Sequence, residues 1–222
     1  MSRKRIEQVA AAGGIAFVVL ESVGQGLIQV GGMEPKFGAP AEEIVEFFLA
    51  RDDTLFMWGG YLSLLSFIAL IWFLGALWAV LRDAEGESAL LSMVAFGSGL
   101  VAVAALTGGG WALAVFRIRD GLDPQIARTL FDLGNFAFAT SWVFYASLLL
   151  AVGVVALQYG ALPRWLGWAS IVIGFGLMVG RIFWTSQAAF TPWVLFWLWL
   201  VVVSVILIRR AGKGHIETAA AG

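Results

Sequence analysis

The sequence contains no cysteine and a single histidine, His215, close to its C-terminus. Without thiols the chain cannot form disulfides, thiolate metal sites, iron–sulfur clusters or cysteine nucleophiles. A histidine outside the apolar part of the chain also excludes histidine-ligated haem and serine–histidine catalysis inside a membrane. The sequence therefore predicts no cofactor and no metal site.

Charged residues are scarce as well. They make up 13% of the 222 residues, whereas hydrophobic residues make up 60%, and the mean hydropathy is +0.88. Soluble domains carry about 25% charged and about 45–50% apolar residues, so this chain cannot cover the surface of a soluble globular fold. The net charge of −1 gives no indication of nucleic-acid binding. We expect an integral membrane protein whose main partner is the lipid bilayer.

Long apolar segments are abundant. A helix needs about 20 mostly apolar residues to cross a bilayer core about 30 Å thick. Six segments come close to this length, which predicts an all-α, polytopic transmembrane bundle over residues 1–210, followed by a polar tail, 211–222. The predicted spans are residues 6–30, 55–81, 89–116, 130–157, 165–184 and 193–208.

The first segment begins like a signal peptide, because the basic residues Arg3, Lys4 and Arg5 precede an apolar stretch. Its strongly apolar part, from Gly14 to Leu20, is short, and no clear small-x-small cleavage site follows it. We therefore expect this segment to stay in the protein as the first helix.

Basic residues in the short loops predict the orientation. With six spans, both termini share a side with the loops at 82–88 and 158–164, and this side holds eight Lys and Arg against six on the other. The clusters from Arg3 to Arg5 and from Arg209 to Lys213 lie directly beside their spans, where positive charge favours the cytoplasmic side. Both termini are predicted to be cytoplasmic.

The first outer loop, residues 31–54, has the pattern of a short helix. Pro40 and the acidic residues after it suit a helix start. Ile44, Phe47 and Phe48 then fall on one face of that helix. This predicts an interfacial helix over the outer end of the bundle, which serves either as a fixed cap or as a lid.

Tryptophans and glycines mark the ends and the contacts of the helices. Trp58, Trp168 and Trp193 lie near predicted helix ends, where we expect them at the level of the lipid headgroups. The Gly176-x-x-x-Gly180 pattern predicts a close helix–helix contact. The glycines at 108–110 indicate either a packing notch or a local unwinding of the helix.

Polar residues inside the spans form the candidate site. An ionisable side chain at the bilayer centre costs about 2.5–3.5 kcal/mol on insertion scales, so it requires a reason. Glu21 lies near the middle of the first span, and Gln25 and Gln29 follow it along one helical stripe. Such a stripe must face protein or water and not lipid.

Two residues of other spans are predicted to lie at a similar depth, Asn135 in the fourth span and Arg181 in the fifth. We therefore predict that Glu21, Gln25, Gln29, Asn135 and Arg181 line an outward-facing cavity that binds a ligand or a proton. In this prediction Arg181 is the cation nearest in depth to Glu21. The alternative is a structural polar network, in which Arg181 extends to the outer interface.

Three classes of function stay open. The first is the binding or transport of a small polar or amphiphilic ligand, with Glu21 as the titrating group. The second is a non-catalytic subunit or scaffold that binds a partner membrane protein. The third is an intramembrane enzyme, which would depend on a carboxylate. The predicted spans contain no lysine, which excludes a retinal Schiff base in the bundle. We predict no catalytic residues and favour the first class.

Four segments carry a family resemblance: EIVEFFLAR at 43–51, WGGYL at 58–62, WFLGALWAVLR at 72–82 and LPRWLGW at 162–168. Together they resemble an uncharacterised family of six-helix membrane proteins of actinobacteria and similar bacteria. The resemblance implies a multi-pass protein of the bacterial plasma membrane, and it implies no activity, substrate or site.

Overall fold

The computed structural model describes residues 3–50, 52–118 and 123–219, with side chains over 4–50, 52–109 and 123–212, and is helical with no strand in these ranges. The helices are α1 (Arg3–Ile28), α2 (Ala41–Leu49), α3 (Asp53–Glu85), α4 (Leu90–Ile118), α5 (Pro124–Tyr159), α6 (Arg164–Ile182), the 3-10 helix η1 (Gln187–Phe190) and α7 (Thr191–Ala219). Within these ranges the prediction of an all-α fold is confirmed.

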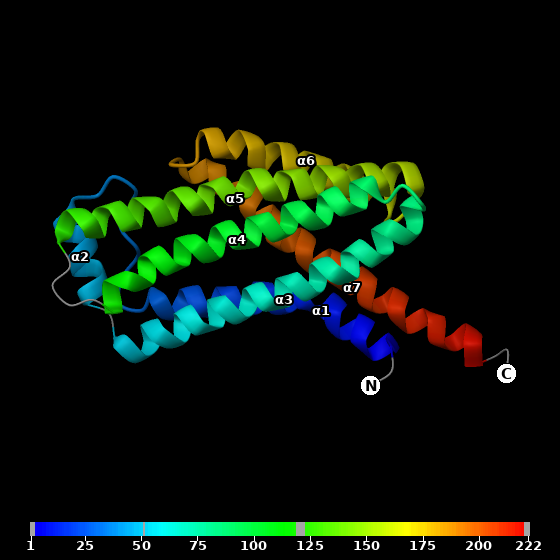
Figure 1. Cartoon of the computed structure of the whole chain (residues 1–222), viewed down its shortest axis with the longest axis horizontal. Coiled ribbons are helices and arrows are strands. Elements are labelled where there is room, and N and C mark those ends of the chain that lie inside the picture. The colour runs from blue at the N-terminus through cyan, green and yellow to red at the C-terminus, as the bar shows by residue number, and fades with distance from the viewer. Residues whose placement is uncertain (1–2, 51, 119–122, 220–222) are drawn as a thin grey trace.

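Six long helices pack side by side into an elongated bundle (Figure 1). Around the bundle α1 contacts α3, α3 contacts α4, α4 contacts α5 and α5 contacts α6, and α7 runs obliquely from α6 back to α1 (Figure 1). Each of the six is long and apolar enough to cross a membrane, as the sequence predicts.

Helices α1 and α3 pack closely because glycines of α1 lie directly against the backbone of α3. A Cβ atom on Gly13 would lie 2.2 Å from the carbonyl oxygen of Ala69, and one on Gly24 would lie 2.7 Å from that of Gly59. Glycine at these positions lets the two backbones touch. This contact fixes the rotation of α1, and with it the direction in which Glu21 points.

The turn between α3 and α4 is closed by a buried glutamate, Glu85. Its carboxylate accepts hydrogen bonds from the backbone N–H of Leu91 at 2.9 Å, from the backbone N–H of Ser92 at 2.8 Å and from the Ser92 hydroxyl at 2.6 Å. The first N–H groups of a helix have no partner within the helix, and a negative charge is favourable there. Glu85 therefore anchors the start of α4.

A short helix is present where the sequence predicts one, as α2, and it lies across the N-terminal end of α5 (Figure 1). Ile44, Phe47 and Phe48 are buried, and the Phe48 ring lies 6.0 Å from Phe56 and 6.2 Å from Phe131, between ring centroids. These contacts are those of a cap packed on the bundle.

The loop between α1 and α2 packs on the same end of the bundle. The ring of Phe37 lies 4.6 Å from that of Trp184, between centroids, so the loop reaches the turn after α6. Glu34 lies in the same loop, and burial raises the pKa of its carboxyl.

The glycine contact between α1 and α3 predicts unequal effects of adding a methyl group. Gly13→Ala forces the two backbones apart and should lower the free energy of unfolding by about 1–3 kcal/mol, as overpacking does. Gly26, on the same helix, has nothing within 4 Å of its Cβ position, so Gly26→Ala should be neutral or stabilising. Thermal unfolding in detergent, followed by circular dichroism, measures both. A Gly13→Ala protein as stable as Gly26→Ala would contradict the close contact.

The raised pKa of Glu34 predicts a pH dependence of stability. The folded state binds this proton more tightly than the unfolded state, so the stabilisation is complete below the ordinary pKa and is lost as the pH rises through the raised pKa. Glu34→Gln should remove this loss, and its melting temperature should exceed that of the wild type increasingly towards neutral pH. Melting curves at several pH values test this, with Glu46→Gln as the control for losing a charge at an exposed position outside the first turn of α2. Parallel pH profiles for wild type and Glu34→Gln would refute it.

Candidate functional site

Glu21 lies inside the bundle, at the contact between α1 and α3, and is 9% exposed. Gln25, one turn later on α1, donates a hydrogen bond from Nε2 to Oε1 of Glu21 at 2.9 Å. Oγ of the fully buried Ser66 on α3 lies 2.9 Å from Oε2 of Glu21. The side chain therefore faces helices and not lipid, and both of its oxygens contact polar groups.

Aromatic side chains of α5 and α7 form a wall inside the bundle, made of Trp142, Tyr145, Trp193 and Trp197. Trp193 stacks on Trp142 at 6.2 Å, and its centroid is 5.6 Å from that of Tyr145 and 6.1 Å from that of Trp197. Trp197 in turn lies 6.0 Å from Phe17, which is one turn before Glu21 on α1. The wall is thus continuous with the face of α1 that carries Glu21.

Three polar atoms of this wall are buried without a hydrogen-bond partner: Trp142 Nε1, Tyr145 Oη and Trp197 Nε1. Trp142 and Tyr145 are completely buried. Folded proteins leave very few buried polar groups unpaired, so such a group requires an explanation. Tyr145 is connected to the Glu21 side of α1 through a chain of ring contacts that runs from Trp193 to Trp197 and on to Phe17.

Two buried hydroxyls on the neighbouring helices are also unpaired, those of Ser63 on α3 and Ser204 on α7. Ser63 faces α1, because a Cβ atom on Gly24 would lie 2.8 Å from its Oγ. Ser204 likewise faces α1, at Gly14. Unpaired polar atoms are therefore contributed by α3, α5 and α7 on the sides that face the core.

The other predicted site residues do not join Glu21. Gln29 is exposed, beyond the end of α1. Asn135 donates a hydrogen bond from Nδ2 to the carbonyl of Phe131 on its own helix, at 3.0 Å. The guanidinium of Arg181 lies 4.7 Å from the centroid of the Phe136 ring, a cation–π contact between α6 and α5. Of the four predicted companions, only Gln25 contacts Glu21.

The sequence reasoning missed the aromatic wall. Trp193 was expected at the headgroups, yet it is only 8% exposed and packs in the core, whereas Trp58 and Trp168 are exposed on the surface of the bundle. The available signal was the spacing of Trp142 and Tyr145 at i, i+3, and of Trp193 and Trp197 at i, i+4, which places each pair on one helix face.

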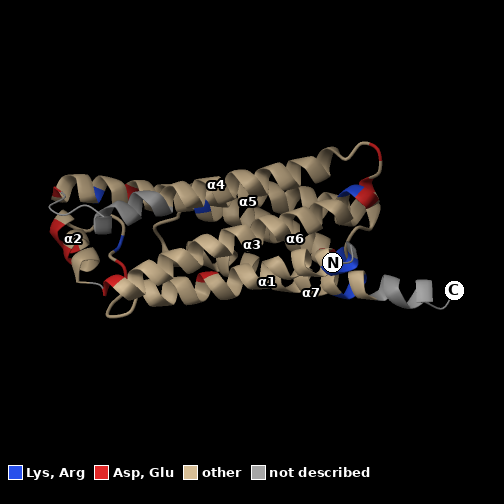
Figure 2. Cartoon of the chain, turned by 60° about the horizontal axis from the view of Figure 1, so that its bottom comes forward, with Lys and Arg blue, Asp and Glu red and all other residues tan. Residues whose placement is uncertain are grey.

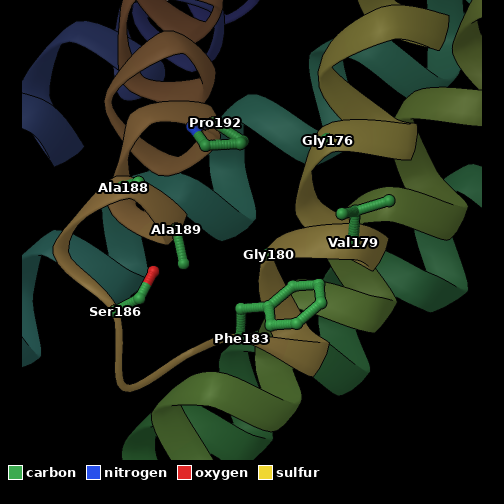
Figure 3. Close-up of a pocket in the computed structure, with 8 residues that line it drawn as sticks. All are labelled: Gly176, Val179, Gly180, Phe183, Ser186, Ala188, Ala189 and Pro192. Carbon is green, nitrogen blue, oxygen red and sulfur yellow. The ribbon is translucent and has the colours of Figure 1, made fainter.

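A surface groove of about 310 Å³ lies elsewhere, between the end of α6 and the start of α7 (Figure 3). Its walls come close because Gly176 faces Pro192 and Gly180 faces Ala189, which confirms the close contact predicted from the glycine pattern. The groove is lined by Gly176, Val179, Gly180, Phe183, Ser186, Ala188, Ala189 and Pro192. None of these residues belongs to the Glu21 cluster.

The glycines at 108–110 form no break, since α4 runs through them as a helix. A Cβ atom on Gly109 would lie 3.0 Å from the carbonyl oxygen of Gly134 on α5. The stretch is therefore a packing notch against α5. In the described part of the chain, no group of three or more His, Cys, Asp or Glu residues is arranged to hold a metal ion.

The fold defines the class: an α-helical, multi-pass membrane protein with six helices able to span the bilayer. Comparison with family models, with curated proteins and with solved structures gives no match. The family resemblance of the sequence therefore stays a prediction, and the site is interpreted from its own geometry.

Proposed function

We propose that the protein binds a small polar or amphiphilic ligand inside its bundle, between Glu21 on α1 and the aromatic wall of α5 and α7. The observation that carries this proposal is the unpaired state of Trp142 Nε1, Tyr145 Oη and Trp197 Nε1 in an aromatic wall that contacts α1 at Phe17, one turn before Glu21. Partners for these groups have to come from inside the bundle, because hydrocarbon offers none.

The chemistry of the site restricts the ligand. Two indole N–H groups and a phenol hydroxyl can donate to a ligand oxygen or nitrogen. The Glu21 carboxyl favours a ligand group that is cationic or donates a hydrogen bond. Aromatic faces bind cations and flat apolar groups. We therefore favour an amphiphilic molecule with a hydrogen-bond acceptor at one end and an amine-like group at the other.

A scaffold or subunit function is the second candidate, and one observation favours it. The contacts of Glu21 with Gln25 and Ser66 are also those expected of a structural tie between α1 and α3. An enzymatic function gains no such support, because neither recorded contact of Glu21 is with a second carboxyl group.

The charge distribution supports an orientation with both termini in the cytoplasm of a bacterial cell and the ligand entering from outside. Figure 2 shows most Lys and Arg at the end of the bundle where the termini lie, together with the acidic residues of the α3–α4 turn, and most Asp and Glu around α2 at the opposite end. The basic end carries Lys4, Arg5, Arg82, Arg164, Arg209 and Arg210. Positive charge beside the spans favours the cytoplasmic side.

The absence of cysteine makes this orientation directly testable, because a single introduced thiol has no background. Glu46→Cys places an exposed thiol on α2, and Glu87→Cys places one in the α3–α4 turn. A membrane-impermeant maleimide should label Glu46→Cys in intact cells, and Glu87→Cys only after permeabilisation. The reverse pattern would invert the orientation, and labelling of both in intact cells would contradict it.

Ligand binding predicts that the purified protein retains a small molecule that depends on Tyr145. Native mass spectrometry of the wild type, released gently from membranes, should show a bound mass. Tyr145→Phe removes one hydrogen bond worth about 0.5–1.5 kcal/mol, so occupancy should fall with an affinity loss of about 2- to 10-fold. Tyr159→Phe removes the same hydroxyl from an exposed position on the same helix and serves as the control.

The same measurement separates the two candidate functions. A bound mass that is unaffected by Tyr145→Phe would contradict this site. A wild type that carries no small molecule and co-purifies with a protein partner would favour the scaffold.

A further inference from the structure

Two glutamates of the described helices, Glu21 and Glu85, are buried to the same extent but have different partners. Both are 9% exposed. The partners of Glu85 include the backbone N–H groups of Leu91 and Ser92, which can only donate. The third partner is the Ser92 hydroxyl, at 2.6 Å. Glu85 therefore accepts at both oxygens and is a carboxylate.

The partner of Glu21 on α3 is already committed to another acceptor. Oγ of Ser66 lies 2.6 Å from the carbonyl oxygen of Ser63 and 2.9 Å from Oε2 of Glu21. A hydroxyl carries one proton, and a carbonyl oxygen carries none. The shorter contact therefore requires the Ser66 proton. If each contact is a separate hydrogen bond, the longer contact between Ser66 and Glu21 then needs a second proton.

We propose that Glu21 is a proton-binding site, held as the neutral carboxylic acid. Its Oε2–H group donates to Ser66 Oγ, the Ser66 hydroxyl donates to the carbonyl of Ser63, and Oε1 accepts from Nε2 of Gln25. In this arrangement each of the three short contacts has its own proton.

The surroundings of Glu21 favour the neutral form. Its hydrogen-bonded neighbours are Gln25 on its own helix and Ser66 on α3, whose hydroxyl also contacts the carbonyl of Ser63. The titratable group of the adjoining aromatic wall is Tyr145 on α5, which lies against Trp193. Phe17, one turn before Glu21, packs against Trp197 on α7, so that side is aromatic. No described Lys or Arg pairs with Glu21, and Arg181 contacts Phe136 instead. A buried carboxylate without a cation is unfavourable.

The alternative is a carboxylate that shares the single Ser66 proton with Ser63 in a three-centre bond, a geometry that proteins do use. That arrangement would leave an uncompensated charge between α1 and α3. The two alternatives differ by one proton, which vibrational spectroscopy detects.

A proton at Glu21 would be exchanged when the ligand binds, a step that rests on the proposed function of this site. An amine-like group that bonds to Oε2 replaces the acid proton, so binding of the cationic form would release one proton. On the same stripe of α1, Gln25 is half-buried and Gln29 is exposed. Polar side chains therefore continue from Glu21 to the end of the bundle that carries α2, which gives the exchanged proton a path in that direction.

Infrared difference spectroscopy of the full chain in lipid bilayers tests the proton. The wild-type spectrum should contain a carboxylic-acid C=O band that shifts in D2O and is lost in Glu21→Gln. Gln has the shape of the neutral acid, so this variant should fold. Glu85→Gln should retain that band and should instead lose carboxylate bands. Ser66→Ala should keep the band and shift it to higher frequency, because the acid loses its acceptor.

Loss of carboxylate bands in Glu21→Gln, with no loss of an acid band, would overturn the proposal. So would an acid band that persists unchanged in Glu21→Gln. The experiment is independent of ligand binding. A protein with no bound small molecule that still loses the acid band in Glu21→Gln would retain the proton site while the proposed ligand function fails.

Discussion

The lack of hydrogen-bond partners in hydrocarbon is the constraint on which this structure depends. A polar group placed inside a bilayer must find its partner within the protein. Glu21 meets this requirement through α1 and α3, where Gln25 and Ser66 contact its two oxygens. These contacts are available only because glycines let the two backbones touch on either side of Glu21. The close packing of α1 on α3 and the burial of Glu21 are thus one feature.

The sequence was sufficient for the elements of the fold, because each has a strong local signal. Six apolar segments of spanning length became α1, α3, α4, α5, α6 and α7, and the stripe of Ile44, Phe47 and Phe48 became the packed face of α2. Length and periodicity decide these elements before any tertiary contact forms.

The candidate site was only partly predictable, because depth in the membrane does not specify the face of a helix. Asn135 and Arg181 were placed beside Glu21 by depth, yet Asn135 bonds within α5 and Arg181 lies over Phe136. The rotation of each helix is set by its packing against its neighbours. The expectation for Trp193 also differed from the structure. Its position near a helix end predicted contact with the lipid headgroups, whereas α7 turns its ring into the core.

The interior is a stronger candidate for specific binding than the groove between α6 and α7. That groove is lined almost entirely by apolar side chains, and any lipid tail satisfies such a surface. The bilayer supplies these tails without limit, so filling the groove selects no particular molecule. Trp142, Tyr145 and Trp197 instead present donors that a hydrocarbon tail cannot pair. Specificity arises where the wrong occupant leaves polar groups unpaired, and within the described chain that condition is met beside Glu21.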